Sequence, residues 1–292
     1  MNTPRFYCPM FGVGRVVLDA AESRHARQVM RLRSGDAVEV FDGAGALGVG
    51  RIAEAGEIER DAARRAGRRD EALHVDVREV HRAALPAATL TLVVAGCKGA
   101  RLDWLVEKCT ELDVTRIVLA EFARSVVHVG VGHVAKLSRA AIEACKQCRR
   151  LWRPTIAAGQ TLDAVVSELA SCAPAGTTAA RLLVADPRPG AEALVDALHG
   201  KRTGDLNVRG GTPGASDAAG EVVCVIGPEG GLTTAERERL RACGARFVTL
   251  GPNVLRVETA AICVVACWSA HVAEVRADSA RGNGAAATPA PT

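Results

Sequence analysis

Two segments in the C-terminal half of the chain constrain its fold most strongly. Each begins with a short run rich in β-branched and aromatic residues, at positions 222–226 and 247–250. Each run breaks at Gly-Pro and continues with helix-forming residues, so both segments predict a strand, a tight loop and a helix. We expect the two loops at the carboxyl ends of neighbouring strands, where open α/β sheets bind ligands.

The first loop carries a clear helix start. Thr233 lies three residues before Glu236, which is the spacing of a capping box, and Gly244 follows at the expected end of that helix. The loop glycines allow a ligand to lie against bare backbone at Gly227, Gly230 and Gly231. Taken alone, each loop is also compatible with a plain turn, because Gly-Pro and Gly-Gly are common in turns.

The second loop ends in Arg256, Glu258 and Thr259, at the start of a helix whose residues 260–268 are apolar on every side. A helix without a polar face is buried all round, in a core or at a subunit interface, so we expect a dimer. Neither loop contains a dinucleotide fingerprint or a Walker motif.

The pair IGPEGGLTTAE and LGPNVLRVETAA resembles the two signature motifs of SPOUT-class methyltransferases, most closely those of the RsmE family. That family methylates N3 of a uridine in small-subunit (16S) ribosomal RNA. The resemblance implies an α/β fold with a C-terminal SPOUT-type trefoil-knotted parallel-sheet domain that binds S-adenosylmethionine. It also implies a small N-terminal PUA-like β-barrel for RNA and an obligate homodimer, with 16S rRNA or the assembled small ribosomal subunit as partner.

The resemblance assigns roles to individual residues. Arg256 is the candidate that stabilises negative charge on the uracil oxygens as N3 loses its proton, because a guanidinium donates paired hydrogen bonds. Glu258 either accepts the proton or holds Arg256 in place. The expected cofactor-binding residues are Ala185, Ile226, Gly227, Glu229, Gly230, Leu250, Gly251, Val254, Leu255, Thr259 and Ala260. No metal is needed, because the sulfonium already carries its leaving group.

The resemblance extends over RHARQVMRLRSGDAVEVFDG, KGARLDWLVEKCTELDVTRIVLAEFARSVV and AIEACKQCRRLWRPTI. These segments supply the expected RNA-binding residues: Arg24, His25, Arg31, Lys98, Arg124, Ser125, Gln147, Arg149 and Arg150. Other readings stay open from the residues alone. A charged helix face is often merely solvated, a cation at a helix end complements the helix dipole, and Arg124 is equally compatible with a salt bridge.

The order of patterns predicts two domains. Residues 1–84 indicate a β-rich unit with a helix around 21–32, a hairpin of strands 37–41 and 47 onward, and a strand at 74–80. Pro86 marks the boundary. Strands and helices alternate in residues 85–276, with strands expected at 89–95, 116–120 and 181–185. Asp186-Pro187 follows the last of these strands, and we expect it to form a further wall for a ligand. Composition predicts a solvated helical insertion at 56–70 and disorder at 199–220 and 277–292.

Composition limits the remaining classes of protein. The chain has 292 residues and a net charge of +4, which permits nucleic-acid binding without requiring it. We expect a cytoplasmic protein, since we see neither a run of membrane-spanning length nor a signal peptide. The ten cysteines lie mostly in apolar patterns and read as reduced core residues. Cys145 and Cys148, like Cys263 and Cys267, lack a second Cys/His pair at zinc spacing, so we expect no metal.

Three alternative functions remain. A SPOUT enzyme acting on a ribose 2′-OH or a tRNA base would share the knot. The barrel that precedes the knotted domain and the residues of the second motif nevertheless favour the RsmE family. A non-catalytic RNA-binding protein on the same fold would have lost the cofactor. An enzyme for nucleoside phosphates would use the glycine-rich loops for an anion.

Overall fold

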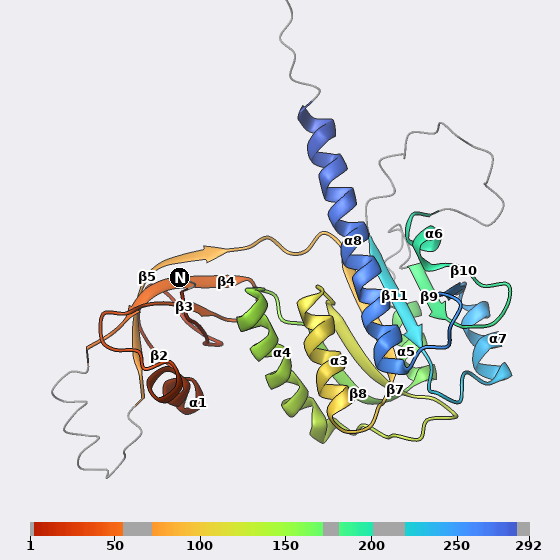
Figure 1. The fold of residues 1–292 in the computed structure, drawn as a ribbon, viewed down its shortest axis with the longest axis horizontal. Coiled ribbons are helices and arrows are strands. Elements are labelled where there is room, and N and C mark those ends of the chain that lie inside the picture. Colours follow the sequence, from red (N-terminus) through yellow and green to blue (C-terminus); the bar gives the residue numbers. More distant parts are fainter. Residues whose placement is uncertain (1–2, 55–71, 172–180, 201–219, 285–292) are drawn as a thin grey trace, which may run out of the picture. The chain divides into compact units, whose positions relative to one another are not determined.

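The computed structural model describes residues 3–54, 72–171, 181–200 and 220–284 (Figure 1). These form two compact units, Met1–Leu85 with Ile142–Arg153, and Pro86–Ala141 with Pro154–Thr292. Residues 142–153, expected in the second domain, therefore belong with the first unit. Two ion pairs hold them there, from Lys146 to Glu22 at 2.9 Å and from Arg149 to Glu39 at 2.7 Å. The insertion expected at 56–70 lies outside the described residues.

The first unit is built on a five-stranded sheet in the order β1-β3-β4-β5-β2. The strands are β1 (Arg5–Tyr7), β2 (Gly14–Val17), β3 (Ala37–Phe41), β4 (Ala46–Ile52) and β5 (His74–Arg82). Only the β1–β3 pair is parallel. The predicted hairpin is confirmed as β3 and β4, whose alternating side chains place Val38, Val40 and Ile52 in a core with Phe6.

The predicted helix in this unit is shorter than expected. Asp19 caps the N-terminus of α1 (Ala20–Arg24), and the chain continues as a π-helix, η1 (His25–Val29). Arg31 then adopts φ = 55°, which no right-handed helix accommodates, so the helix cannot reach residue 32.

The second unit contains a seven-stranded sheet in which every pair is parallel. The order is β10 (Glu192–Ala193), β12 (Arg246–Thr249), β9 (Arg181–Ala185), β11 (Glu221–Ile226), β6 (Thr89–Ala95), β7 (Arg116–Glu121) and β8 (Thr155–Thr161). The expectation that the two glycine loops follow neighbouring strands is wrong. Both β11 and β12 pair with β9, which lies between them.

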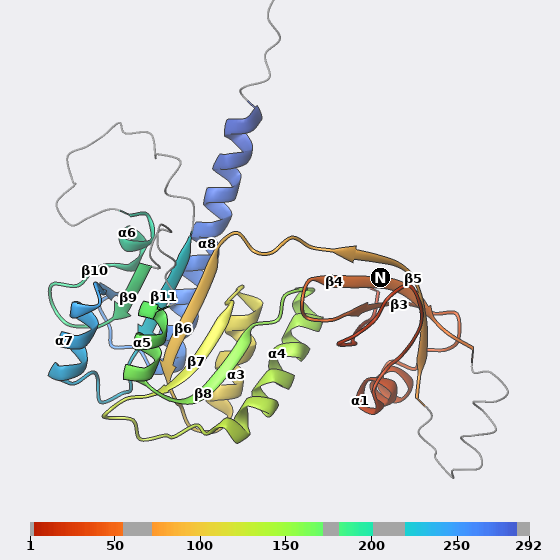
Figure 2. The ribbon, with the colours of Figure 1, turned by 180° about the vertical axis from the view of Figure 1, so that it is seen from behind.

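Helices cover both faces of this sheet (Figures 1 and 2). On one face, α3 (Ala100–Glu111), α6 (Leu194–Leu198) and α8 (Val257–Gly284) bury a core that includes Leu105 and Trp268. On the other, α5 (Leu162–Ser171) and α7 (Thr234–Ala242) contribute Val165 and Leu240. The short helix η2 (Val131–His133) leads into α4 (Val134–Cys148), which passes from the second unit into the first.

The C-terminal helix departs from expectation in two ways. It continues to Gly284, so residues 277–284 are helical rather than a disordered tail; Ser279 Oγ donates to the carbonyl of Val275, and Arg281 pairs with Asp278. Residues 285–292 lie outside the described part. The disordered insertion expected at 199–220 does not begin at residue 199, because His199 caps α6 and Gly200 follows it in the structure. Residues 201–219 lie outside the described part.

The apolar stretch of α8 is not buried on all sides within one chain. Val264, Val265 and Trp268 are buried, whereas Cys263 and Cys267 are partly exposed. By length and composition Val257–Ser279 also qualifies as a membrane span, with a mean hydropathy of 1.3, which the sequence analysis overlooked. One side of this helix packs into the hydrophobic core against the sheet. A single such helix is therefore weak evidence for a membrane span.

Candidate active site

A cleft lies at the carboxyl ends of β9, β11 and β12, where the two glycine loops meet the end of the strand between them. Most of the expected cofactor residues line it: Ala185, Ile226, Gly227, Glu229, Leu250, Gly251, Val254, Leu255 and Ala260. Gly230 and Thr259 do not line it. Asp186 and Pro187 also line the cleft, at the end of strand 181–185, where a further ligand wall was expected.

The cleft also contains a charged cluster, in which two arginines that were not predicted from the sequence, Arg188 and Arg237, pair with Asp186. Asp186 is buried, and its carboxylate accepts hydrogen bonds from Arg237 Nε at 3.0 Å and Arg188 Nη2 at 3.1 Å. Arg237 also donates to the carbonyl of Leu232. The cluster joins the end of β9 to α7. Arg237 carried no sequence signal, because nothing in the pattern of α7 indicates a partner on another strand.

The first glycine loop, residues 227–233, is fixed at several points. The predicted capping box is confirmed, with Glu236 N donating to Thr233 Oγ1 at 3.2 Å and Thr233 N to Glu236 Oε2 at 2.7 Å. The other oxygen of Glu236 accepts from the backbone N–H of Ala123 at 2.8 Å. Arg124, which the sequence left open between RNA contact and salt bridge, donates to the carbonyl of Gly230 at 2.8 Å. The loop is thereby tied to the segment after β7.

The second loop, residues 250–256, has fewer attachments. Gly251 has φ = 134°, and its N–H donates to Thr249 Oγ1 at 3.3 Å. Val254 is 82% exposed. The Arg256 side chain is exposed, and within the described residues it has no hydrogen bond or ion pair. Arg256 does not line the cleft itself, but its neighbours Leu255 and Val257 do. The expected catalytic residue is therefore exposed and lies between two residues of the cleft lining.

Glu258 is buried in the first turn of α8 with only 5% exposure. Its Oε1 lies 3.5 Å from Arg101 Nε, and its Oε2 has no hydrogen-bond partner among the described residues. The side-chain partner seen for Glu258 is thus Arg101 rather than Arg256. Nearby, burial and the charges of Glu258 and Glu229 raise the pKa of the Cys97 thiol to about 11. Cys97 therefore stays a neutral thiol near pH 7 and is no nucleophile here.

Residues 84–269 match the model of a family described as an RNA methyltransferase domain. The chain belongs to this RNA methyltransferase family. Residues 18–59 match a second model, the RNA methyltransferase PUA domain, in agreement with the expected N-terminal unit. The parallel sheet of the second unit confirms the expected α/β class.

Individual relatives within the RNA methyltransferase family agree. The chain is 28% identical to the ribosomal RNA small subunit methyltransferase E of Synechocystis over 84% of this chain and 69% of the relative. It is 29% identical to the protein of the same name from Mycobacterium bovis, over 84% and 82%. A crystal structure of a probable rRNA-methyltransferase from Porphyromonas gingivalis is 26% identical with a TM-score of 0.69, covering 94% of this chain and 99% of that one. The S-adenosyl methionine-bound methyltransferase E of Neisseria gonorrhoeae, 24% identical over 92% and 98%, shares the fold with a TM-score of 0.68.

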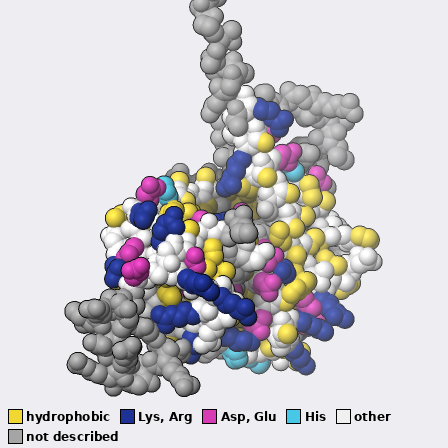
Figure 3. Space-filling model, turned by 60° about the vertical axis from the view of Figure 1, so that its left-hand side comes forward, with side chains coloured by type: hydrophobic (Ala, Val, Ile, Leu, Met, Phe, Trp, Pro, Cys, Tyr) yellow, Lys and Arg dark blue, Asp and Glu magenta, His cyan; other side chains and the backbone are white. Residues whose placement is uncertain are grey.

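A member of the RNA methyltransferase family also needs a surface for its substrate, and the nine expected RNA contacts differ in availability. Arg149 is engaged by Glu39, and Ser125 Oγ accepts from the N–H of Phe122 at 3.0 Å. His25 lies edge-on to Phe6 with ring centroids 6.5 Å apart. The exposed members are Arg24, Arg31, Lys98, Arg124 and Gln147, while Arg150 is half-buried. On the face drawn in Figure 3, basic side chains alternate with acidic ones instead of forming one large basic patch.

Proposed function

We propose that this protein transfers a methyl group from S-adenosylmethionine to N3 of a uridine in the 16S rRNA of the small ribosomal subunit. The observation that carries the proposal is the cleft formed by both signature loops around the end of β9. Relatives named ribosomal RNA small subunit methyltransferase E, aligned over 84% of the chain, support the substrate. The knot of the SPOUT fold remains a prediction.

The residues around the cleft fit this cofactor. Ile226, Leu250 and Leu255 offer apolar walls to a flat adenine, and the backbone of the two glycine loops lines the cleft beside them. The carboxylate of Glu229 is suited to hydroxyl and ammonium groups. At Gly227 a methyl side chain would come within 2.9 Å of Leu232 Cδ2, so the first loop leaves little room for a larger residue.

S-adenosylmethionine supplies an activated methyl group together with its leaving group. The chain must stabilise the uracil as N3 loses its proton and negative charge spreads onto O2 and O4. Arg256 is suited to this task, because its guanidinium is always cationic and has no competing partner among the described residues. Its place on the less attached loop allows it to reach over the mouth of the cleft.

We assign Glu258 as the residue that either accepts the N3 proton or positions a cation beside the cleft. Its unpartnered Oε2 is available as an acceptor, while Oε1 faces Arg101. Glu258→Gln keeps the shape and removes the negative charge. A base role predicts loss of the ascending limb of the pH–rate profile in Glu258→Gln, whereas a positioning role predicts a lower rate at every pH.

The proposed reaction has a direct readout, because a methyl group on N3 blocks the Watson–Crick edge of uracil. 16S rRNA from a deletion strain, incubated with the protein and cofactor, should acquire a reverse-transcriptase stop at one uridine. Naked RNA and assembled subunits should be compared as substrates. A 2′-O-methyl or a tRNA product would support the other SPOUT activities. Cofactor binding without any methyl transfer would support the non-catalytic alternative.

The same proposal includes a cytoplasmic homodimer. Ile262, Cys263, Ala266 and Cys267 form a partly exposed apolar face on α8, and a second copy would cover it. Light scattering at low micromolar concentration should give about twice the chain mass of 30.5 kDa. A stable, active monomer would contradict the dimer. RNA affinity should fall as salt rises, since phosphate contacts release counterions.

A further inference from the structure

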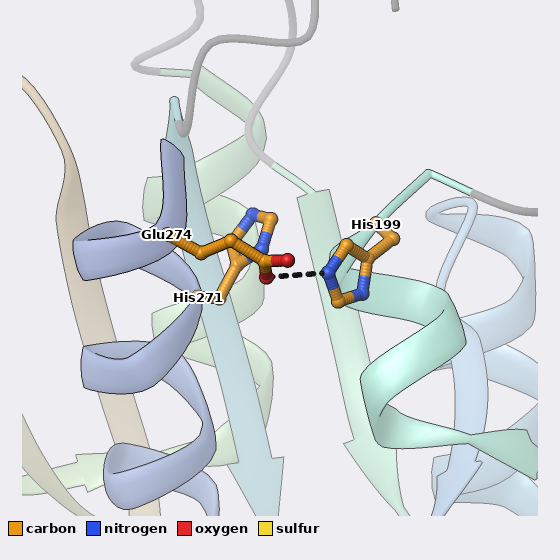
Figure 4. A group of neighbouring side chains, drawn as sticks. All are labelled: His199, His271 and Glu274. Atoms are coloured by element: carbon orange, nitrogen blue, oxygen red, sulfur yellow. Dashed lines mark hydrogen bonds and ion pairs between the residues drawn. The ribbon is translucent and has the colours of Figure 1, made fainter. Parts of the chain in front are cut away.

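Three side chains with metal-binding atoms meet between α6 and α8, in the second unit (Figure 4). They are His199, at the C-terminal end of α6, and His271 and Glu274 on α8. Their ligand atoms all lie within 4.8 Å of one another. His271 and Glu274 are three positions apart on the helix and therefore project from the same face.

The hydrogen-bond partners of His199 do not match the single N–H of a neutral imidazole. Its Nδ1 lies 2.7 Å from the carbonyl oxygen of Val195, and its Nε2 lies 3.0 Å from a carboxylate oxygen of Glu274. Both partners are acceptors, whereas a neutral imidazole has a single N–H. If Nδ1 donates to the carbonyl, the Nε2 lone pair faces a carboxylate. A cation shared by Nε2 and the carboxylate removes this conflict, and metal-bound histidines commonly donate their other N–H to a backbone carbonyl.

His271 provides the second, independent observation. It is only 6% exposed, and neither ring nitrogen has a hydrogen-bond partner among the described residues. Leaving a buried polar group unpaired is costly, so such a group calls for a missing partner. Burial disfavours the charged ring and lowers the pKa of His271. Its ring lies edge-on to that of His199, with centroids 4.8 Å apart. Neutral imidazole is the form that binds metals.

We propose that His199, His271 and Glu274 bind one divalent transition-metal ion of the Zn²⁺ class. Two imidazole nitrogens and one carboxylate oxygen form a known zinc donor set, with a water in the fourth position. Mg²⁺ and Ca²⁺ prefer oxygen donors and are disfavoured by two imidazoles. Bonds of about 2.0–2.2 Å to a tetrahedral ion place the donor atoms about 3.4 Å apart. The partly exposed side chain of His199 and the exposed side chain of Glu274 can close the remaining distance by small rotations.

The site fastens α6 to α8 and is separate from the cleft. Val257 and Ala260 line the cleft at the start of α8, and His271 lies about 21 Å from Val257 along the helix at 1.5 Å per residue. We therefore assign the ion a structural role. No metal was expected from the sequence, because neither cysteine pair has a second Cys/His pair at zinc spacing. The three ligands proposed here are far apart in the sequence, so no local motif indicates them.

The test uses the full chain, without a histidine tag, after treatment with a chelator. Titration with Co²⁺ should show one ion per chain and the visible absorption of a tetrahedral complex without a sulfur charge-transfer band. Zn²⁺ should displace it and raise the melting temperature in a concentration-dependent way. Glu274→Gln and His199→Gln should each weaken Zn²⁺ binding at least about tenfold. The side chain is 31% exposed for His199 and 59% exposed for Glu274, and glutamine is polar, so these variants should fold normally.

His128→Gln is the matched control, since His128 forms an exposed pair with Glu121 at 3.5 Å outside the cluster. It should bind Zn²⁺ like the wild type. Three outcomes would overturn the site: no stoichiometric binding, equal affinity in the wild type and both cluster variants, or a sulfur-to-cobalt band that assigns the ion to cysteines. In the first case, the contact between His199 and Glu274 is a direct hydrogen bond without an ion.

Discussion

The two glycine loops at the carboxyl edge of the sheet look alike in sequence but are held very differently. The first loop is fixed by the capping box of α7, by Arg124 and by the Asp186–Arg237 ion pair. The second loop is held by the bonds between Thr249 and Gly251 and by the start of α8. A strand, a Gly-Pro break and a helix therefore specify where a loop lies, but its cross-links to other elements decide how rigid it is.

This contrast suggests a division of labour. A loop fixed at several points offers a preformed wall to a cofactor, while a loop with few attachments can move a side chain toward a substrate. The candidate catalytic Arg256 belongs to the second kind. Substitutions in the two loops should therefore change different quantities, and the following experiments test whether they do.

The largest expected effect is on Arg256. Arg256→Ala should bind S-adenosylmethionine almost normally and turn over about a hundred- to a thousandfold more slowly, roughly 3 to 4 kcal/mol, because only the transition state loses a partner. Arg256→Lys should recover little, since an ammonium cannot make paired contacts. Calorimetry reports cofactor binding, and primer extension reports the methylated base.

A proportional loss of cofactor affinity in Arg256→Ala would instead assign this residue to the cofactor wall. The two loops would then share one role, and the division of labour would be wrong.

The next largest effect concerns the Asp186–Arg237 ion pair, which braces the first loop against the end of β9. Arg237→Leu removes one partner of the buried Asp186 carboxylate, while Arg188 remains. We expect a loss of about 2 to 3 kcal/mol in the free energy of unfolding, below the full cost of an unpaired buried charge, and weaker cofactor binding. Arg239→Leu is the matched control on the same helix. Its pair with Asp163 is half-exposed, so its loss should cost roughly 0 to 0.5 kcal/mol. Urea unfolding distinguishes the two, and equal losses would refute the bracing.

Local patterns in the sequence predicted much of this site. The strands at 89–95 and 181–185 and the capping box at Thr233 depend on neighbouring residues, and the structure confirms all three. The position of β9 between β11 and β12 was not predictable in this way, because strand order depends on pairing over long separations.

The same reason explains the contacts that were missed. Arg237, which pairs with the expected cleft residue Asp186, and the pair His199 and His271 come from elements that only the tertiary fold brings together. Strand β8 and the two-residue β10 were not predicted either. The run TIAAGQT of β8 contains glycine, alanine and glutamine, which give no strand periodicity, and β10 is too short to produce a pattern.

A smaller effect is expected in the second loop, at Gly251. Its φ of 134° is strained for any residue with a Cβ, although no atom lies within 4 Å of an added methyl group. Gly251→Ala should cost about 1 to 3 kcal/mol, which this weakly attached loop can relieve partly by moving. Gly244→Ala, with φ = 79° and equally open surroundings, is the control outside the cleft. Both should lower the melting temperature, but only Gly251→Ala should also weaken cofactor binding; equal cofactor affinities would mean that the second loop does not shape the cleft.

The smallest effect tests whether the capping box stiffens the first loop or only starts α7. Thr233→Ala removes the hydroxyl that accepts from Glu236 N, and losing an N-cap typically costs about 0.5 to 2 kcal/mol. Glu236 keeps its bond to the N–H of Ala123, so we expect about 1 kcal/mol. Thr234→Ala is the matched control, because this exposed neighbour takes no part in the cap. Hydrogen exchange then locates the change. If the cap stiffens the loop, the amide of Gly231, which donates to the carbonyl of Pro228 at 2.7 Å, should exchange faster in Thr233→Ala than in Thr234→Ala. If only the amides of α7 respond, the rigidity of the first loop comes from Arg124 and Arg237 alone.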